Sequence, residues 1–294
     1  MSTLQALVDA VALGSIYALV AVGIGLVFGV LRLINFAYGE LITAGAYTLW
    51  VLRSLPAVVA ILACFAVVVS LSLLLERVAF RPLRKATPAT MLIATFAVSY
   101  LLQSIYLLVF GSLGNSVSTL AGLQQAVDLG GLRIRWITIV SLACGSFLLI
   151  GTAILLGRTS IGLHMRAAAT DFQTARVLGV RANRVIAFAF LVSGVLAASV
   201  SVLFTVQNSL VTPDLGVPIT IFALVGVVVG GLDRLWTATL GGFAIGFAYS
   251  LLGDKLSGEA RVYLPSLVFG LVIVVLLLRP GGLFAGQPRS VERV

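Results

Sequence analysis

Long apolar stretches separated by short polar segments make up most of this 294-residue chain. A helix needs about 20 mostly apolar residues to cross a bilayer. Six stretches approach or exceed that length, and they predict membrane-spanning helices at Leu4–Val30, Pro56–Leu75, Ala89–Phe110, Trp136–Leu156, Val185–Val206 and Arg261–Leu278. The pattern therefore predicts an all-α protein, a polytopic bundle of membrane helices.

Three further segments are shorter or more polar than these six. Val217–Gly231 and Trp236–Leu252 flank a charged pair, and this arrangement predicts a tight membrane hairpin. Phe36–Leu52 is apolar but contains Glu40 and many small residues, so it either spans the membrane or lies buried in the bundle. The expected total is eight or nine membrane helices in a single domain that covers residues 1–294.

The placement of cations predicts which side of the membrane each loop faces. Three polar segments carry most of them: Arg77–Lys85, residues 157–184 and residues 279–294. Cytoplasmic loops are enriched in Lys and Arg, so these three segments are expected in the cytoplasm. The cation-poor loops Gly111–Arg135 and Gln207–Gly216 are expected outside. The N-terminus lies outside if all nine segments span, and inside if Phe36–Leu52 does not cross.

Composition agrees with a membrane protein and narrows its partners. The chain is 60% hydrophobic and 10% charged, whereas soluble domains are about 25% charged. The net charge of +9 follows from the cytoplasmic loops, so a nucleic-acid partner is not expected. Both cysteines, Cys64 and Cys144, lie in apolar stretches, and no disulfide framework or metal-binding spacing is visible.

The residues needed for common catalytic sites are missing. A phosphate-binding P-loop needs a lysine after a glycine-rich turn, and neither Lys85 nor Lys255 has that context. The single histidine, His164, has no nearby partner for hydrolase or zinc chemistry. We therefore expect no catalytic residue, no metal and no cofactor in this chain, and neither a membrane enzyme nor a scaffold is favoured.

One predicted membrane segment contains a dense polar cluster. The cluster consists of Asn35, Tyr38, Glu40 and Thr43. A charge inside a bilayer is costly and normally faces a cavity or a partner. Two interpretations are open: the segment lines a translocation path, or Glu40 lies near the interface and pairs with Arg32.

Other polar and small residues favour structural roles. Ser99, Tyr100 and Gln103 lie within a predicted span and are expected to form interhelical hydrogen bonds. Glycines four residues apart favour close helix packing, at Gly25/Gly29, Gly226/Gly230 and Gly242/Gly246. Glycine-rich stretches early and late in the chain hint at two related halves. A solvated outer turn is expected at Gln207, Asn208, Thr212 and Asp214.

The arginine-rich segment 157–184 predicts two short helices. The sequence HMRAAAT favours the first. The second is Phe172–Leu178, with Thr170 or Asp171 as its N-terminal cap and Gly179 as a left-handed C-terminal cap. Phe172, Ala175 and Leu178 share one face in this helix, with Val177 beside them, and form an apolar ridge. Either membrane lipid or a partner protein is expected to cover that ridge.

Four separated blocks of the sequence carry a family resemblance. They are GSIYALVAVGIGLVFGVLRLINFAYGEL (Gly14–Leu41), ERVAFRPLR (Glu76–Arg84), GLHMRAAATDFQTARVLGV (Gly162–Val180) and RPGGLF (Arg279–Phe284). With these blocks in this order, the chain resembles the permease subunits of ABC importers for branched-chain (hydrophobic) amino acids, the high-affinity leucine/isoleucine/valine type. The resemblance extends over almost the full length and implies the ABC importer permease fold.

The resemblance also implies a set of partners. Two separate ATPase subunits would bind ATP, a second, related permease subunit would complete the path, and a periplasmic or extracellular binding protein would deliver the amino acid. The protein would lie in a bacterial inner membrane, with residues 157–184 as the coupling loop and residues 279–294 as a cytoplasmic tail. The ATPase-coupling residues would be Arg166, Ala167, Asp171, Phe172, Ala175, Leu178 and Gly179.

The resemblance places the Asn35–Glu40 block near the pathway but does not fix the substrate. The family often has histidine where this chain has Tyr38, and some relatives carry urea or short amides. A rival of another class, an ion-coupled secondary transporter, predicts carboxylates within the membrane, and Glu40 is the one candidate.

Overall fold

The computed structural model describes residues 3–83, 86–117, 121–129, 132–170, 172–231, 234–256, 258–279 and 282. Its helices are α1 (Thr3–Leu31), α2 (Tyr38–Val51), α3 (Ala57–Leu75), α4 (Arg81–Leu83), α5 (Pro88–Phe110), α6 (Trp136–Arg158), α7 (Ser160–Thr170), α8 (Phe172–Val177), α9 (Ala182–Gln207), α10 (Gly216–Gly230), α11 (Leu235–Lys255) and α12 (Leu264–Leu278). The π-helical turn is η1 (Glu76–Phe80), and the 3-10 turns are η2 (Ala121–Gln124) and η3 (Gly258–Tyr263). The strands are β1 (Asn115–Ser116), β2 (Ala126–Leu129), β3 (Leu132–Arg135) and β4 (Leu210–Val211).

The predicted all-α membrane bundle is confirmed. Within the described ranges, seven helical segments are long and apolar enough to cross a membrane, and they include all six long spans expected from the sequence. The seventh is α11, which was predicted as a shorter stretch but extends to Lys255. The helix after Pro56 also continues through η1 and α4 to Leu83, so Arg77 and Arg81 are helical rather than in a loop. Arg84 and Lys85 lie outside the described residues.

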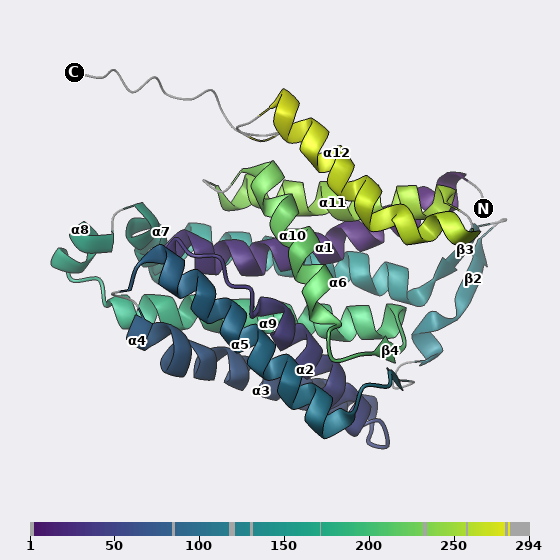
Figure 1. The fold of residues 1–294 in the computed structure, drawn as a ribbon, viewed down its shortest axis with the longest axis horizontal. Coiled ribbons are helices and arrows are strands. Elements are labelled where there is room, and N and C mark those ends of the chain that lie inside the picture. The colour runs from purple at the N-terminus through teal and green to yellow at the C-terminus, as the bar shows by residue number, and fades with distance from the viewer. Residues whose placement is uncertain are drawn as a thin grey trace.

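Helix α1 forms the core of the bundle. The most apolar part of α1 is 83% buried inside the protein, whereas the corresponding parts of α6 and α12 are 17% buried and leave their apolar surfaces for lipid. In Figure 1, α1 runs through the middle of the molecule, between α9 and α11. A helix surrounded by others contacts any path through the bundle, so α1 is central to the site described below.

The two ends of the bundle differ in character (Figure 1). One end, called here the α7–α8 end, holds α4, α7 and α8. The other, the strand end, holds the N-terminus and two small antiparallel sheets, in which β1 pairs with β4 and β2 pairs with β3. Gly282, beyond α12, approaches the carbonyl of Val229 near the end of α10, which belongs to the α7–α8 end. The N-terminus and the end of α12 therefore face opposite ends.

Helices α2 and α10 are short and begin inside the bundle. They contain 14 and 15 residues, which gives lengths of about 21–23 Å, less than the roughly 30 Å of a bilayer core. Their N-termini touch, because Gly39 and Gly216 approach each other so closely that neither position has space for a Cβ. From this crossing α2 runs to the strand end and α10 to the α7–α8 end (Figure 1).

The crossing has matching turns on its two sides. The hydroxyl of Thr43 donates to the carbonyl of Gly39 at 3.2 Å, and that of Thr220 donates to Gly216 at 2.9 Å. The N–H of Gly216 donates to the Thr43 hydroxyl at 3.0 Å. Two half-length helices that run in opposite directions from one point are typical of inverted repeats in transporters. Segment Phe36–Leu52 therefore does not span alone, and the chain recrosses with the help of residues 32–37.

Glycines allow α1, α10 and α11 to pack closely together, in a contact that we call the glycine seam. A Cβ on Gly226 would lie 2.7 Å from the Cα of Gly242, and one on Gly246 would lie 2.9 Å from the Cα of Gly14. The pairs Gly226/Gly230 and Gly242/Gly246 thus serve helix packing, as predicted. Gly29 differs, since no atom lies within 4 Å of its Cβ position.

Candidate functional site

Glu40 lies in the packed crossing of α2 and α10, inside the protein. Its side chain is fully buried, and its Oε1 accepts hydrogen bonds from Ser99 and from Gln103, both at 2.9 Å. The Tyr106 hydroxyl donates to the Glu40 backbone carbonyl at 2.9 Å. Ser99 and Gln103 are therefore interhelical hydrogen-bond donors, as expected. Tyr100 instead is 73% exposed, because it points outward on the same helix, so that prediction is wrong for Tyr100.

The predicted alternative pairing of Glu40 with Arg32 is wrong. Arg32 Nη2 donates instead to the backbone carbonyl of Ala169 at 2.9 Å. Arg32 follows the end of α1 and has φ of 54°, a left-handed conformation that is rare for a side chain of this size. The bond joins the end of α1 to the last turn of α7, where carbonyls lack helical partners. This contact joins residues 137 positions apart, and no local pattern in the sequence predicts it.

The other three polar residues of this segment are also buried and engaged. The Asn35 Oδ1 accepts a hydrogen bond from the N–H of Ala37 at 3.0 Å and so supports the turn before α2. The hydroxyl of Tyr38 packs against Gly23 and is 3.5 Å from the Ser193 carbonyl. Thr43 belongs to the matched turns described above. All four side chains thus hold the crossing together, and a pathway role for them stays a prediction.

Segment 157–184 folds as α7, α8 and the start of α9. Arg166 is exposed and its Nη1 donates to the Gly157 carbonyl at 3.3 Å, while Ala167 is half-buried. Asp171 lies outside the described residues, and only the backbone of Phe172 is described. The C-terminal cap is as predicted, because Gly179 has φ of 88° and the N–H of Val180 donates to the Ala175 carbonyl at 3.0 Å. This bond is the Schellman pattern.

The apolar ridge of α8 agrees with the predicted one at Val177 and Leu178 but not at Ala175. Ala175 is buried against the rest of the protein, so it does not share an exposed face with Leu178. Among the side chains described in this segment, Val177 and Leu178 are 87% and 79% exposed. Helix α8 ends at Val177, one residue before the predicted end. Ala175 is missing from the exposed ridge because α8 packs that side chain against the rest of the protein.

A cavity of about 660 Å³ opens at the α7–α8 end. Its lining is mostly apolar and comes from α1, α6, α7 and α11, together with Val227 of α10. Arg32 and Arg166 also line it, and so does Ala169, the acceptor for Arg32. The link between α1 and α7 therefore forms part of the cavity wall. We call this space the α7–α8 cavity.

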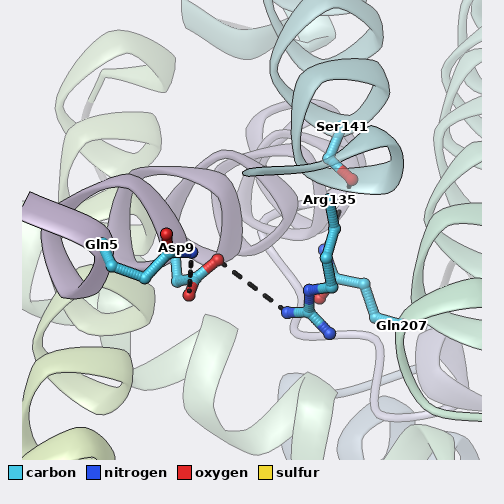
Figure 2. A network of polar contacts seen from close by, with 5 residues as sticks. All are labelled: Gln5, Asp9, Arg135, Ser141 and Gln207. Carbon is cyan, nitrogen blue, oxygen red and sulfur yellow. Dashed lines mark hydrogen bonds and ion pairs between the residues drawn. The ribbon is translucent and has the colours of Figure 1, made fainter. Parts of the chain in front are cut away.

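A second cavity, of about 960 Å³, opens at the strand end. Apolar residues of α1, α9, α10 and α12 form part of its lining. The charged and polar side chains of the lining are Asp9, Arg135, Gln207, Asn208, Thr212, Asp214, Tyr249, Ser250, Asp254 and Arg261. Figure 2 shows Arg135 between Asp9 and Gln207. The predicted solvated turn at Gln207–Asp214 thus forms one wall of this cavity. The sequence pattern did not predict the cavity, because its other walls come from helices that are distant in the chain.

Helix α1 lines both cavities, from Asp9 to Tyr17 at the strand end and from Val22 to Arg32 at the other. Between them α1 contacts the glycine seam, where Gly242 packs on Tyr17 and Ala21. Asn35, Tyr38, Glu40 and Thr43 are not among the described residues that line either cavity. Two cavities separated by closely packed helices fit a transport protein that opens to one side at a time.

Comparison with known proteins identifies the family. Residues 6–277 match the family described as branched-chain amino acid transport system / permease component. The high-affinity branched-chain amino acid transport system permease protein BraD of Pseudomonas aeruginosa is 32% identical over 305 residues, which cover 99% of this chain and 98% of BraD. The corresponding protein LivH of Escherichia coli is 32% identical, with 99% and 97% covered. With its multi-pass helical bundle, the chain belongs to the branched-chain amino acid transport system permease family.

Proposed function

We propose that this chain is the permease subunit of an ATP-driven importer for branched-chain or related hydrophobic amino acids. The full-length similarity to BraD and LivH carries this proposal. The sequence contains no P-loop lysine, so ATP would be bound by two partner ATPase subunits. A second, related permease subunit and an external amino acid-binding protein would complete the importer in the inner membrane of the cell.

Helix α8 would be the contact with the ATPase. The exposed pair Val177 and Leu178 lies at the C-terminal end of α8, at the end of the molecule that has the arginine-rich segment. Apolar side chains that are this exposed at a helix end favour a protein partner. Arg166, Ala167, Asp171, Phe172, Ala175 and Gly179 would position α8, with Ala175 and Gly179 acting through its C-terminal cap.

The strand end would face outside and the α7–α8 end the cytoplasm. This orientation follows from the cations of segment 157–184 and the positive-inside tendency. Substrate would enter the strand-end cavity and leave through the α7–α8 cavity, and ATPase action on α8 would bias the bundle between two arrangements. The crossing of α2 and α10, with Asn35, Tyr38, Glu40 and Thr43, would be the fixed centre of this movement.

Reconstitution of the complete importer in liposomes tests the proposal. Leucine uptake from the loaded binding protein should require ATP on the ATPase side and should stop when ADP replaces ATP. Uptake driven by a proton or sodium gradient without the ATPases would contradict the proposal and favour the secondary transporter. Competition by urea or acetamide, but not by isoleucine or valine, would favour an amide carrier of the same family.

A further inference from the structure

The strand-end cavity combines two kinds of surface. Its charged members sit at the ends of helices, with Asp9 on α1 and Arg135 at the start of α6. The deeper lining is apolar and aromatic, since Tyr17 is stacked with Tyr249 at 6.4 Å and Phe222 meets Tyr249 at 5.1 Å. A cavity with charges of both signs at its mouth and aromatic rings below suits a small molecule with a zwitterionic head and an apolar body.

Asp9 and Arg135 are close but are not hydrogen-bonded to each other. Arg135 Nη2 lies 3.8 Å from Asp9 Oδ1, beyond the usual N–H···O distance of about 2.7–3.2 Å. Asp9 Oδ2 accepts a hydrogen bond from Gln5 Nε2 at 3.1 Å, which fixes the carboxylate (Figure 2). Asp9 Oδ1 is buried and has no hydrogen-bond partner among the described residues. A buried carboxylate oxygen without a donor has an unmet requirement for one.

The residues below Asp9 supply the apolar part of the site. Leu13 and Tyr17 follow Asp9 at intervals of four residues, so the three side chains share one face of α1. Each interval corresponds to about 6 Å along the helix. A head group held at Asp9 would therefore place a four-carbon side chain beside Leu13, directed toward the rings of Tyr17 and Phe222.

We propose that Asp9 and Arg135 form the head-group site for an α-amino acid with an apolar side chain in the strand-end cavity. The α-ammonium group donates to Asp9 Oδ1, and the α-carboxylate accepts from the guanidinium of Arg135. The side chain of the ligand lies along Leu13. This inference rests on the proposed function and adds to it a substrate site on the permease itself, apart from the binding protein.

The two charges of the ligand give the site its selectivity. A molecule with only a carboxylate leaves Asp9 Oδ1 without a donor, and a molecule with only an ammonium group leaves Arg135 without an anion. Each loss removes one charge-assisted hydrogen bond, which corresponds to about tenfold or more in affinity. The lining of the cavity also includes Asp254 and Arg261, which are both exposed and serve as a matched comparison for the same changes of charge.

Protection of a cysteine in the cavity wall tests the site. Thr212→Cys places a thiol in the half-buried wall, with Cys64 and Cys144 replaced by Ala so that the reporter reacts alone. The sample is the complex of permease and ATPase subunits without binding protein. Leucine should slow alkylation of the thiol. The two single-charge analogues, 4-methylpentanoate and 3-methylbutylamine, should require about tenfold higher concentration for the same effect.

The leucine concentration that protects the thiol should rise about tenfold in Asp9→Asn and in Arg135→Gln. It should not change in the comparison variants Asp254→Asn and Arg261→Gln. Equal protection by the single-charge analogues, or loss of protection only with the Asp254 and Arg261 variants, would overturn the site. The analogue comparison needs no change at Asp9 or Arg135, so it holds even if those variants fold poorly. If leucine gives no protection while the complete importer transports it, this site is wrong and the proposed function stands. Absence of ATP-driven uptake by the complete importer would instead refute the proposed function.

Discussion

Single atoms decide how the centre of the bundle packs. Gly39 and Gly216 let the backbones of α2 and α10 touch, and Tyr38 lies against Gly23 in the same way. Glu40 is fully buried beside this contact, and one of its oxygens receives two hydrogen bonds. A carboxylate near the first turn of α2 also offsets the positive end of that helix. The cluster therefore has a structural role, while Glu40 Oε2 is buried and has no hydrogen-bond partner among the described residues.

Gly39→Ala should destabilise the permease by about 1–3 kcal/mol, because the added methyl group would overlap the Gly216 carbonyl and the Thr220 hydroxyl. The measurement is the thermal unfolding of the purified subunit in detergent. Gly29→Ala is the control, since its Cβ position has no neighbour within 4 Å. Equal melting temperatures for the two variants would refute the close contact at the crossing.

Glu40→Gln should fold at a normal level, because its amide oxygen still accepts from Ser99 and Gln103. Glu40→Ala should lose about 1–3 kcal/mol of stability, since it leaves those donors unpaired. Membrane abundance and leucine uptake of the two variants separate structure from transport. If Glu40→Gln changes neither membrane abundance nor leucine uptake, then the charge of Glu40 has no role in the translocation path.

Elements rather than single residues define the two ends of the molecule. Helix α8 and its Gly179 cap could be predicted from the sequence, because a helix end depends on residues close together in the chain. The exposed ridge was predicted correctly at Val177 and Leu178 but not at Ala175, since the burial of Ala175 depends on how α8 packs. The crossing of α2 and α10 could not be predicted, because the hydrogen bond from Gly216 to Thr43 joins residues 173 positions apart.

Gly179→Val should uncouple ATP hydrolysis from uptake, because a β-branched residue is strained at φ of 88°. The strain of about 1–2 kcal/mol opposes the cap of α8. Gly179→Asn is the matched variant, since Asn tolerates this conformation and the surrounding space is open. The ratio of leucine transported to ATP hydrolysed should fall in Gly179→Val and should stay at the wild-type level in Gly179→Asn. A normal ratio for Val would show that the cap does not matter for coupling.

Arg32→Gly should also lower the ratio of leucine transported to ATP hydrolysed. Glycine suits the left-handed φ of 54° but cannot donate to the Ala169 carbonyl, so it removes the link between α1 and α7 without backbone strain. Arg32→Lys keeps a cation near the C-terminus of α7 and should retain more coupling. Unchanged coupling in Arg32→Gly, at normal abundance, would mean that α8 acts on the bundle through another route.

At the scale of the whole molecule, the seven membrane-length helices of the described residues and the short helices α2 and α10 separate two cavities and two unlike ends. The six long spans followed from hydropathy alone, since lipid requires apolar length. The cavities did not, because their walls combine α1 with helices from the second half of the chain. The approach of Arg135 to Asp9 was likewise not predicted, because it joins the start of α6 to α1, and the two residues are 126 positions apart in the chain.

Cysteine labelling from each side of the membrane tests the orientation. Val177→Cys and Leu113→Cys are matched reporters, because the native side chains are 87% and 82% exposed at opposite ends. With Cys64 and Cys144 replaced by Ala, an impermeant maleimide should label Leu113→Cys in intact cells and Val177→Cys in inverted vesicles. Added ATPase subunits should protect Val177→Cys alone. Protection of neither reporter would favour lipid as the cover of α8.

The meeting of α2 and α10 also has a consequence for how the protein is made. Each helix is too short to settle across a bilayer independently, and their contact residues are separated by 173 positions in the chain. At a synthesis rate of about 5–20 residues per second, α2 waits roughly 10–35 s for α10 to emerge from the ribosome. During that interval the buried carboxylate of Glu40 depends on Ser99 and Gln103, which are synthesised sooner. Residues of the first half of the chain thus provide the hydrogen bonds to the Glu40 carboxylate in the membrane before the second half has been synthesised.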